Sequence, residues 1–335
     1  MRTLLLTDLH LYEKPPGYLD AQVYTIIKIL EEHKGVDDCV ILGDVFMRRK
    51  PSPSELLAFQ HICWRLNALK IPTTILRGNH DSEDKSDNGV TVLSLYESDY
   101  ILVAKHIKYH GRDGRERVFI PHYEDESRII DELENAPANA VIFGHFGYNG
   151  CMNSIGDIDF GIDLKYFKNQ TYLGHIHKFK KEDNVTILGT PWTTNFGEAG
   201  DWKGYHILEG DKLYSHTTKH GPMHIVMTLE EVQDSVEHLN HLHENYFTLL
   251  RVLLDQGEGM KDMPDDLEVS HLDFKYKPSF DDDRQSSWKP QAELFQINSQ
   301  IIEDYVNGCV TSLDSSSIME GYGIIKGGEE LPDED

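Results

Sequence analysis

Five short motifs combine Asp, Asn and His side chains, most of them next to a glycine, and each follows a segment that we expect to be a β-strand. In chain order they are Asp8-Leu9-His10, Gly43-Asp44, Gly78-Asn79-His80-Asp81, Gly144-His145 and Gly174-His175-Ile176-His177. Carboxylate, amide and imidazole groups together suit divalent ions such as Mn²⁺, Fe²⁺ or Zn²⁺. The pattern therefore indicates a site for two metal ions that hydrolyses a phosphate ester.

The spacing of these residues agrees with such a site. Two metal ions about 3.5–4 Å apart can hold a phosphate and activate a water molecule, and they need a carboxylate that bridges them. A glycine beside a ligand lets the chain turn sharply and keeps the site open. His175 and His177 are two positions apart, so they share a face of an extended segment, and Asp8 and His10 have the same spacing.

Each motif alone has a purely structural interpretation. A Gly-Asp pair such as Gly43-Asp44 is usually a turn, and His145 is more often a packed or solvated residue at a strand end. His175 and His177 could be polar residues at a strand edge, and Asn79-His80-Asp81 could be a plain turn. The occurrence of all the motifs in one chain, in this order, favours the metal site over these interpretations.

The elements that position the motifs alternate between strands and helices up to about residue 210. We expect helices at 19–32 and 54–69, the second with Ser54 as its N-cap, between strands at 3–7, 39–42 and 73–76. Further strands follow at 101–103, 107–109, 118–120, 141–143, 172–173, 185–188, 205–209 and 212–216, the last two joined by a hairpin turn at Gly210-Asp211. This order predicts an α/β fold in which two packed sheets are flanked by helices.

The composition changes after residue 220, and we divide the chain accordingly. Residues 1–220 are expected to carry the metal site, and residues 221–280 to form a small α+β domain with strands at 224–227, 246–254 and 267–276 and a helix at 229–241. Residues 281–310 are expected to hold a polar linker and an amphipathic helix at 291–307, and residues 311–335 an acidic, disordered tail.

Composition limits the class of protein. The net charge of −25 argues against a protein that coats nucleic acid with its own surface, but a centre of two metal ions adds about four positive charges. No stretch is apolar enough to span a membrane, and the first residues are expected to form a strand rather than a signal peptide. The cysteines Cys39, Cys63, Cys151 and Cys309 are widely separated, which fits a reducing, cytoplasmic location.

The ordered motifs resemble those of the calcineurin-like metallophosphoesterase superfamily over residues 8–177. The resemblance implies that one metal ion is held by Asp8, His10 and His177, a second by Asn79, His145 and His175, and that Asp44 bridges both. It also implies that His80 is not a ligand but protonates the leaving oxygen or stabilises the transition state. Asp81 would orient His80 and keep its imidazole in the required tautomer.

Further segments are similar to SbcD-type nucleases of double-strand-break repair and to phage recombination endonuclease subunits. They are Phe119-Ile120-Pro121-His122-Tyr123, Gly144-His145-Phe146-Gly147-Tyr148-Asn149-Gly150, and Gly189-Thr190-Pro191 through Phe196-Gly197-Glu198-Ala199-Gly200. This resemblance implies a Mn²⁺-dependent DNA exonuclease and endonuclease that hydrolyses phosphodiesters with metal-activated water. It also implies a DNA-binding cap at 221–280, a homodimer, a location in the host cytoplasm if a phage encodes the chain, and an SbcC-type SMC-like ATPase partner that binds the 291–307 helix.

Several alternatives stay open at this point. The substrate could be a cyclic nucleotide, another small phosphodiester or a phosphoprotein, or the chain could be a scaffold that binds DNA ends without cleaving them. The basic run Arg48, Arg49 and Lys50 could contact a DNA phosphate or be a solvated loop. The 291–307 helix could dock on its own domain, and the helices at 19–30 and 54–69 could form the dimer or only cover the sheet.

Overall fold

The computed structural model describes residues 1–112, 114–151 and 161–277. Its helices are α1 (Tyr18–Glu32), α2 (Pro53–Leu69), α3 (Glu126–Asn135), α4 (Leu229–Asp234) and α5 (Val236–Asn245). Its strands are β1 (Arg2–Leu6), β2 (Asp38–Ile41), β3 (Thr73–Leu76), β4 (Ile101–Ala104), β5 (Lys108–Arg112), β6 (Arg115–Ile120), β7 (Val141–His145), β8 (Thr171–Gly174), β9 (Lys180–Glu182), β10 (Val185–Ile187), β11 (Gly204–Glu209), β12 (Lys212–Thr217), β13 (Pro222–Thr228), β14 (Phe247–Leu254) and β15 (His271–Tyr276). The strands form three sheets.

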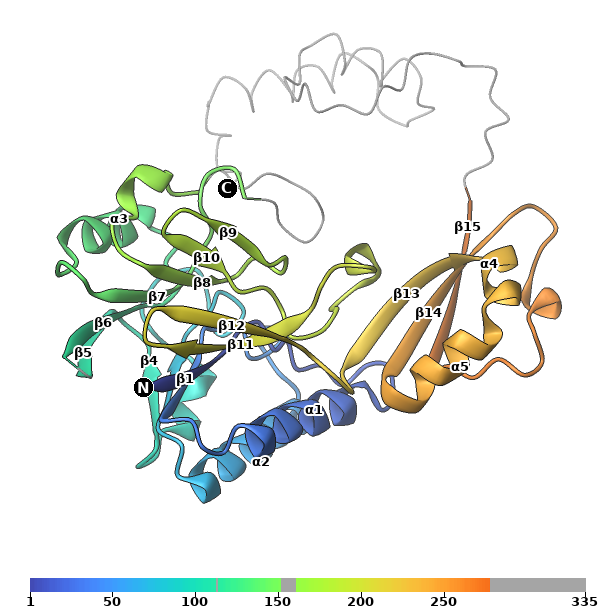
Figure 1. Ribbon diagram of the computed structural model, residues 1–335, viewed down its shortest axis with the longest axis horizontal. Helices are drawn as coiled ribbons and strands as arrows, with labels where there is room; N and C mark the ends of the chain where they lie inside the picture. The colour runs from blue at the N-terminus through green and yellow to red at the C-terminus, as the bar shows by residue number, and fades with distance from the viewer. Residues whose placement is uncertain (113, 152–160, 278–335) are drawn as a thin grey trace, which may run out of the picture. The chain divides into compact units, whose positions relative to one another are not determined.

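The first sheet has the strand order β12-β11-β1-β2-β3-β4, and β1 to β4 run parallel (Figure 1). Its central strands are buried on both faces, which explains their continuous apolar sequences. Side chains alternate along a strand, so Leu4 and Leu6 pack with the helices α1 and α2, while Leu5 packs towards the second sheet. The strands therefore lie between a helical layer and a second sheet.

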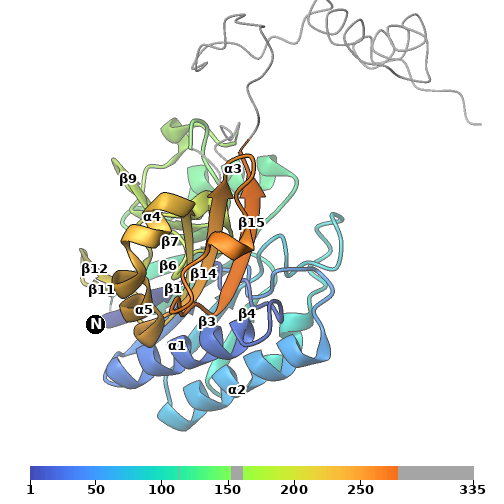
Figure 2. The same ribbon diagram turned by 90° about the vertical axis from the view of Figure 1, so that its right-hand side faces the viewer.

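Helices α1 and α2 run side by side along the first sheet in both views (Figures 1 and 2). Helix α2 begins at Pro53, slightly earlier than the sequence predicted, because Ser52 rather than Ser54 is its N-cap. The Ser52 hydroxyl accepts from the Glu55 amide at 3.3 Å, and the Glu55 carboxylate accepts from the Ser52 amide at 2.8 Å. Pro53 then occupies the first helical position, where its missing N–H costs no hydrogen bond.

The second sheet has the order β5-β6-β7-β8-β10-β9, with β6, β7 and β8 parallel. It packs against the first sheet through Phe119, Phe143 and Tyr172, whose rings stack in sequence. Its other face packs with helix α3, which the sequence analysis did not predict. These two sheets and their helices confirm the expected two-sheet α/β sandwich flanked by helices, and the β11–β12 hairpin turns at Gly210 as expected.

The third sheet, β13-β14-β15, is parallel and has its own apolar core with α4 and α5. The single helix expected at 229–241 is two helices, because the chain leaves helical geometry at Ser235, with φ −124° and ψ 17°. The small α+β unit is therefore present, although Met1–Lys277 is one compact unit by its contacts and the division at residue 220 stays a prediction. The linker, the 291–307 helix and the acidic tail lie outside the described residues.

Two other expectations concern the whole chain. Cys39, Cys63 and Cys151 are buried, and Cys309 lies outside the described residues. In the part of the chain that the structure describes, none of the helices has both the length and the apolar character that crossing a bilayer requires.

Candidate metal centre

The motif residues come together where the parallel strands of both sheets end. Asp8, Asp44 and Asn79 follow β1, β2 and β3, while His145 ends β7 and His175 follows β8. The carboxyl ends of parallel strands lie at one edge of a sheet, which is where α/β folds bind ligands. Because two sheets contribute, the site is lined by loops from both halves of the sandwich.

The backbone at this edge is held in an uncommon conformation. Asp8, His10, Asp44 and His175 all have positive φ, between 44° and 81°, although none of them is glycine. Left-handed backbone is disfavoured for residues with a Cβ atom, and such residues gather at functional sites. The loops thus carry conformational strain at four of the side chains that the sequence assigned to metal binding.

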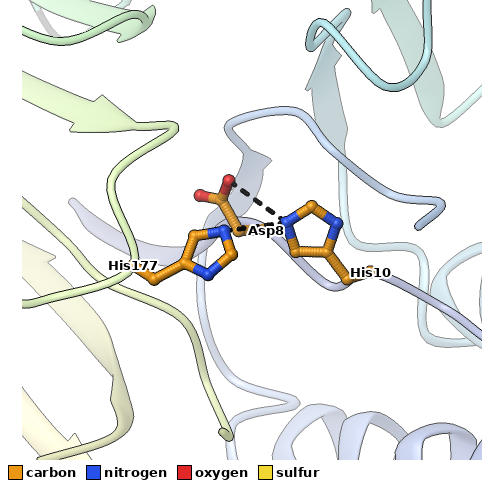
Figure 3. A group of neighbouring side chains, drawn as sticks. All are labelled: Asp8, His10 and His177. Carbon is orange, nitrogen blue, oxygen red and sulfur yellow. Dashed lines mark hydrogen bonds and ion pairs between the residues drawn. The ribbon is translucent and has the colours of Figure 1, made fainter. Parts of the chain in front are cut away.

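Asp8, His10 and His177 form the first group of neighbouring ligand atoms (Figure 3). The Nε2 atoms of His10 and His177 face each other at 3.0 Å, and Asp8 Oδ1 lies 3.8 Å from His10 Nε2. The other oxygen of Asp8 accepts from the Thr7 hydroxyl at 2.5 Å and from the His175 amide at 3.0 Å. These hydrogen bonds orient the carboxylate towards the two imidazoles.

Asp44, His145 and His175 form the second group, and Asn79 lies between its imidazoles. Asn79 Oδ1 is 3.1 Å from His145 Nε2 and 3.1 Å from His175 Nδ1. His145 Nε2 is also 3.3 Å from Asp44 Oδ1. The structure therefore brings together all of the residues that the sequence assigned to a second metal ion.

The Asp44 carboxylate lies between the two groups. Its Oδ1 faces His145, and its Oδ2 lies 3.9 Å from His10 Nε2 in the first group. One carboxylate thus presents one oxygen to each group, as a bridging ligand must. His80 also has a ring nitrogen close to the ligand atoms of His10 and Asp44, so it borders both groups.

The donor chemistry of the site fits cations. His145 Nδ1 donates to the Leu42 carbonyl at 2.5 Å, so in the neutral ring Nε2 carries a lone pair, and it faces the oxygens of Asp44 and Asn79. His177 Nδ1 donates to Glu198 at 2.7 Å, so its Nε2 likewise presents a lone pair to His10. Acceptors that face acceptors in a buried site require a proton or a cation between them. Metal ions would satisfy them.

The pKa values of the buried imidazoles and carboxylates show the same need for a positive charge between them. Burial, together with the adjacent His177, lowers the pKa of His10 to about 4. Burial opposes the charged form of His145 as well, but the adjacent Asp44 carboxylate dominates and raises its pKa to about 9. Burial likewise opposes the charged form of Asp44, yet His145 and His10 hold its pKa well below the usual value. A proton on His145 thus takes the position that a cation would occupy.

His80 and Asp81 follow Asn79 but have different partners. The Met47 carbonyl accepts from His80 Nδ1 at 2.6 Å, and the His80 amide donates to Asp44 Oδ1 at 2.9 Å. The sequence predicted that Asp81 orients His80, but here the ring is oriented by Met47. Asp81 instead accepts from the amides of Val45 and Gly78 at 3.0 Å each, and so joins the loops that follow β2 and β3.

The three residues of the basic run after Asp44 have different surroundings. The Arg48 guanidinium lies 4.8 Å from the centre of the Tyr12 ring and forms an ion pair with the buried Glu55. Arg49 Nε donates to the Asn79 carbonyl at 3.1 Å, next to the second group. Lys50 is exposed. Arg49 is therefore the member of the run that borders the metal site.

The sequence analysis missed Glu198, although it quoted the segment that contains it. Glu198 is 1% exposed, and besides His177 it binds the Lys203 ammonium at 2.8 Å. Lys203 Nζ also donates to the His177 carbonyl at 3.0 Å. A carboxylate behind a ligating histidine fixes its tautomer and raises its basicity. Nothing in the spacing of the motifs indicates that the Glu198 carboxylate contacts the His177 ring.

Gly78 shows why the loop glycines are needed. A Cβ atom at this position would collide with the Asp44 backbone amide and its carboxylate. The glycine therefore allows the loop after β3 to approach the loop after β2, so that Asn79 and Asp44 can serve the same site. A larger residue would separate the two groups.

The sequence matches the calcineurin-like phosphoesterase family over residues 1–244. Exonuclease subunit 1 of Enterobacteria phage T4 is 25% identical over 245 residues, which cover 67% of this chain and 70% of that protein. A Thermus thermophilus structure has a TM-score of 0.39 at 13% identity and covers 64% of this chain and 98% of its own. A structure described as a novel archaeal phosphodiesterase has a TM-score of 0.36 at 13% identity, with coverages of 64% and 99%.

Proposed function

The chain belongs to the calcineurin-like phosphoesterase family, and we propose that it is a DNA nuclease subunit that cleaves duplex ends as an exonuclease and single strands as an endonuclease. The observation that carries this proposal is the pair of ligand groups that share Asp44. The choice of DNA rests on the similarity to a phage protein named an exonuclease subunit. The family relation supports hydrolysis of a phosphate ester, and the DNA substrate is the proposed refinement.

In this proposal Asp8, His10 and His177 hold one divalent ion, Asn79, His145 and His175 hold the other, and Asp44 bridges them. The ions, when bound, would polarise the phosphate and activate the attacking water. His80 donates Nδ1–H to the Met47 carbonyl, so when the ring is protonated at both nitrogens it is the Nε2 proton that it gives to the leaving oxygen. Asp81 keeps the loops that carry Asp44 and Asn79 together.

The test is cleavage of labelled linear duplex and single-stranded DNA with Mn²⁺, Mg²⁺ or EDTA. We expect Mn²⁺-dependent degradation that His80→Asn reduces by about 10²–10⁴-fold, which is the usual contribution of a proton-transferring group. His241→Asn is the matched control, because that side chain is 73% exposed on helix α5. Hydrolysis of a cyclic nucleotide or small phosphodiester without DNA cleavage would instead indicate a small-molecule phosphodiesterase. Binding of DNA ends without any hydrolysis would indicate a scaffold.

The partners and the location are part of the same proposal. The relative is named a subunit, which supports a complex, and we expect an SbcC-type SMC-like ATPase as the other component, in the cytoplasm of the host cell if a phage encodes the chain. The expected contact, the 291–307 helix, lies outside the described residues. Co-purification of the full chain with such an ATPase, compared with a chain that ends at residue 290, tests the contact. Equal capture by both chains would refute it.

A homodimer is proposed through the outer face of the helical layer. On α2, Leu57 is 68% and Trp64 is 63% exposed, and their spacing of seven residues places them on one face of the helix. Tyr24 on the adjacent α1 is 50% exposed. A second copy that packs on this face would bury these side chains. Sedimentation should show a dimer that Trp64→Glu converts to a monomer, and a monomeric wild-type chain would refute the arrangement.

A further inference from the structure

One carboxylate beside the metal centre is shared by three side chains that can donate hydrogen bonds. Glu124 Oε1 lies 3.7 Å from Arg49 Nη2 and 3.8 Å from His122 Nε2, and Glu124 Oε2 lies 4.0 Å from Lys85 Nζ. All three distances exceed those of hydrogen bonds. The carboxylate is thus held loosely among the three groups rather than bound by any one of them.

This cluster borders the second group of ligand atoms. Arg49 donates to the Asn79 carbonyl at 3.1 Å, and the His122 ring centre lies 5.9 Å from that of His175 and 6.3 Å from that of His145. The cluster is also open to solvent on its outer side, since Glu124 is 36% and Lys85 is 75% exposed.

His122 has hydrogen-bonding capacity that its neighbours do not use. Its Nδ1 is buried and has no hydrogen-bond partner among the described residues. A neutral histidine ring offers one N–H and one lone pair. A buried polar atom without a partner is rare and indicates a ligand or a functional constraint.

The backbone that carries His122 and Glu124 is held by hydrogen bonds to neighbouring segments. The His122 amide donates to the Arg77 carbonyl at 2.9 Å, and the Arg77 guanidinium returns a hydrogen bond to the His122 carbonyl at 2.5 Å. The amides of Glu124 and Asp125 donate to the two oxygens of Asp87 at 3.0 and 3.1 Å. The Glu124 side chain can therefore move while the backbone of its segment stays in place.

We propose that Arg49, His122 and Lys85 form a phosphate-binding subsite next to the second metal position, and that Glu124 occupies this subsite until a phosphate displaces it. The ligand is a non-scissile phosphate of the bound nucleic-acid strand, so the proposal rests on the proposed nuclease function. A phosphate oxygen accepts charge-assisted hydrogen bonds from a guanidinium and an ammonium more strongly than a loosely held carboxylate does. The Glu124 carboxylate therefore competes with substrate.

The test measures binding rather than cleavage. A fluorescein-labelled single-stranded oligonucleotide is titrated with Mn²⁺-loaded protein that carries His80→Asn, and its anisotropy is followed at several salt concentrations. We expect Arg49→Ala to weaken binding about tenfold, as the loss of a charge-assisted hydrogen bond does, and to reduce the slope of log affinity against log salt by about 0.7. Glu124→Gln should tighten binding because it removes the competing charge.

Two comparisons separate a role in binding from a structural one. His122→Gln keeps an N–H donor and should bind more tightly than His122→Phe, which fills the space without one. Arg115→Ala is the matched control, because Arg115 is a half-exposed arginine paired with Asp211 at the opposite end of β6 from His122. Unchanged oligonucleotide affinity and salt slope in Arg49→Ala and in His122→Phe would overturn the subsite.

Sulfate binding distinguishes failure of the subsite from failure of the proposed function. Calorimetry with sulfate, in the presence of Mn²⁺, uses an anion that resembles a phosphate group but carries no nucleic acid. If the wild-type site binds no oligonucleotide but binds sulfate in a manner that Arg49→Ala weakens, the subsite stands and the DNA substrate is wrong. If Arg49→Ala and His122→Phe leave oligonucleotide and sulfate binding unchanged, the subsite is wrong and the proposed nuclease function is unaffected.

Discussion

Replacement of Glu198 by glutamine should weaken one metal position while leaving the ligands themselves in place. Glu198 Oε1 accepts from His177 Nδ1 at 2.7 Å, and Oε2 accepts from Lys203 Nζ at 2.8 Å. A glutamine can keep an oxygen on only one of these sides, because its NH₂ group would face a donor on the other. Loss of the partner of a ligating histidine lowers metal affinity by about 10–100-fold, which corresponds to roughly 1.4–2.7 kcal/mol.

The same substitution should also destabilise the fold, so the two effects must be measured separately. Lys203 is 9% exposed and would lose its only carboxylate partner among the described residues. Removal of one member of a buried ion pair costs about 3–5 kcal/mol. We expect the lower end, because Lys203 Nζ keeps the His177 carbonyl at 3.0 Å and the Thr190 hydroxyl at 2.8 Å.

Calorimetric titration with Mn²⁺ gives the metal affinities, and urea unfolding in EDTA gives the stability without metal. Glu182→Gln is the matched control, because Glu182 also pairs with a lysine, Lys180, but is 38% exposed and lies on β9 at the edge of the second sheet. A folded Glu198→Gln protein whose two Mn²⁺ affinities both stay within about twofold of wild type would refute the assigned role of Glu198, since loss of a carboxylate behind a ligating histidine weakens metal binding by at least about tenfold.

Four further results are expected. Asp44→Asn should reduce the metal content from two ions to one or none by mass spectrometry, because each Asp44 oxygen faces a different group. Gly78→Ala should weaken metal binding in calorimetry, because its Cβ would collide with Asp44. Leu5→Ala should lower the free energy of unfolding in urea by about 2–5 kcal/mol, because Leu5 is fully buried between the sheets. His206, whose pKa burial lowers to about 4, should make the protein about 3 kcal/mol less stable as the pH falls from 6.5 to 4, because the unfolded chain takes up the proton first, and His206→Gln should flatten this dependence.

The sequence was sufficient to predict that these side chains come together, because they are tied to strand ends. Asp8, Asp44 and Asn79 each follow a short apolar strand, and parallel strands place their carboxyl ends at one edge. The hairpin at Gly210 was equally predictable, because a Gly-Asp pair between two alternating segments favours a tight turn. These features follow from local sequence patterns and do not depend on contacts with distant segments.

What could not be predicted depends on contacts between distant segments. Arg48 looked free to meet DNA, but Glu55, seven residues later on α2, holds it in an ion pair. Glu198 reaches His177 only because the chain turns back after β10, and no local sequence pattern predicts this contact. Helix α3 is different, because its local signal was present and was missed: Ile129 and Leu133 are four residues apart, and Asp125 is the N-cap.

Because the chain is strongly acidic, metal ions at the candidate site would also help to attract a negatively charged substrate. With 57 acidic and 32 basic residues, the chain has a net charge of −25, which opposes the approach of a polyanion. Two divalent ions at the candidate site would add about four positive charges close to Arg49 and Lys85. A metal-loaded centre would then be the place at which the proposed DNA substrate meets positive charge. Chelation should therefore abolish DNA binding as well as cleavage, and oligonucleotide affinity that EDTA leaves unchanged would locate the DNA-binding surface elsewhere on the chain.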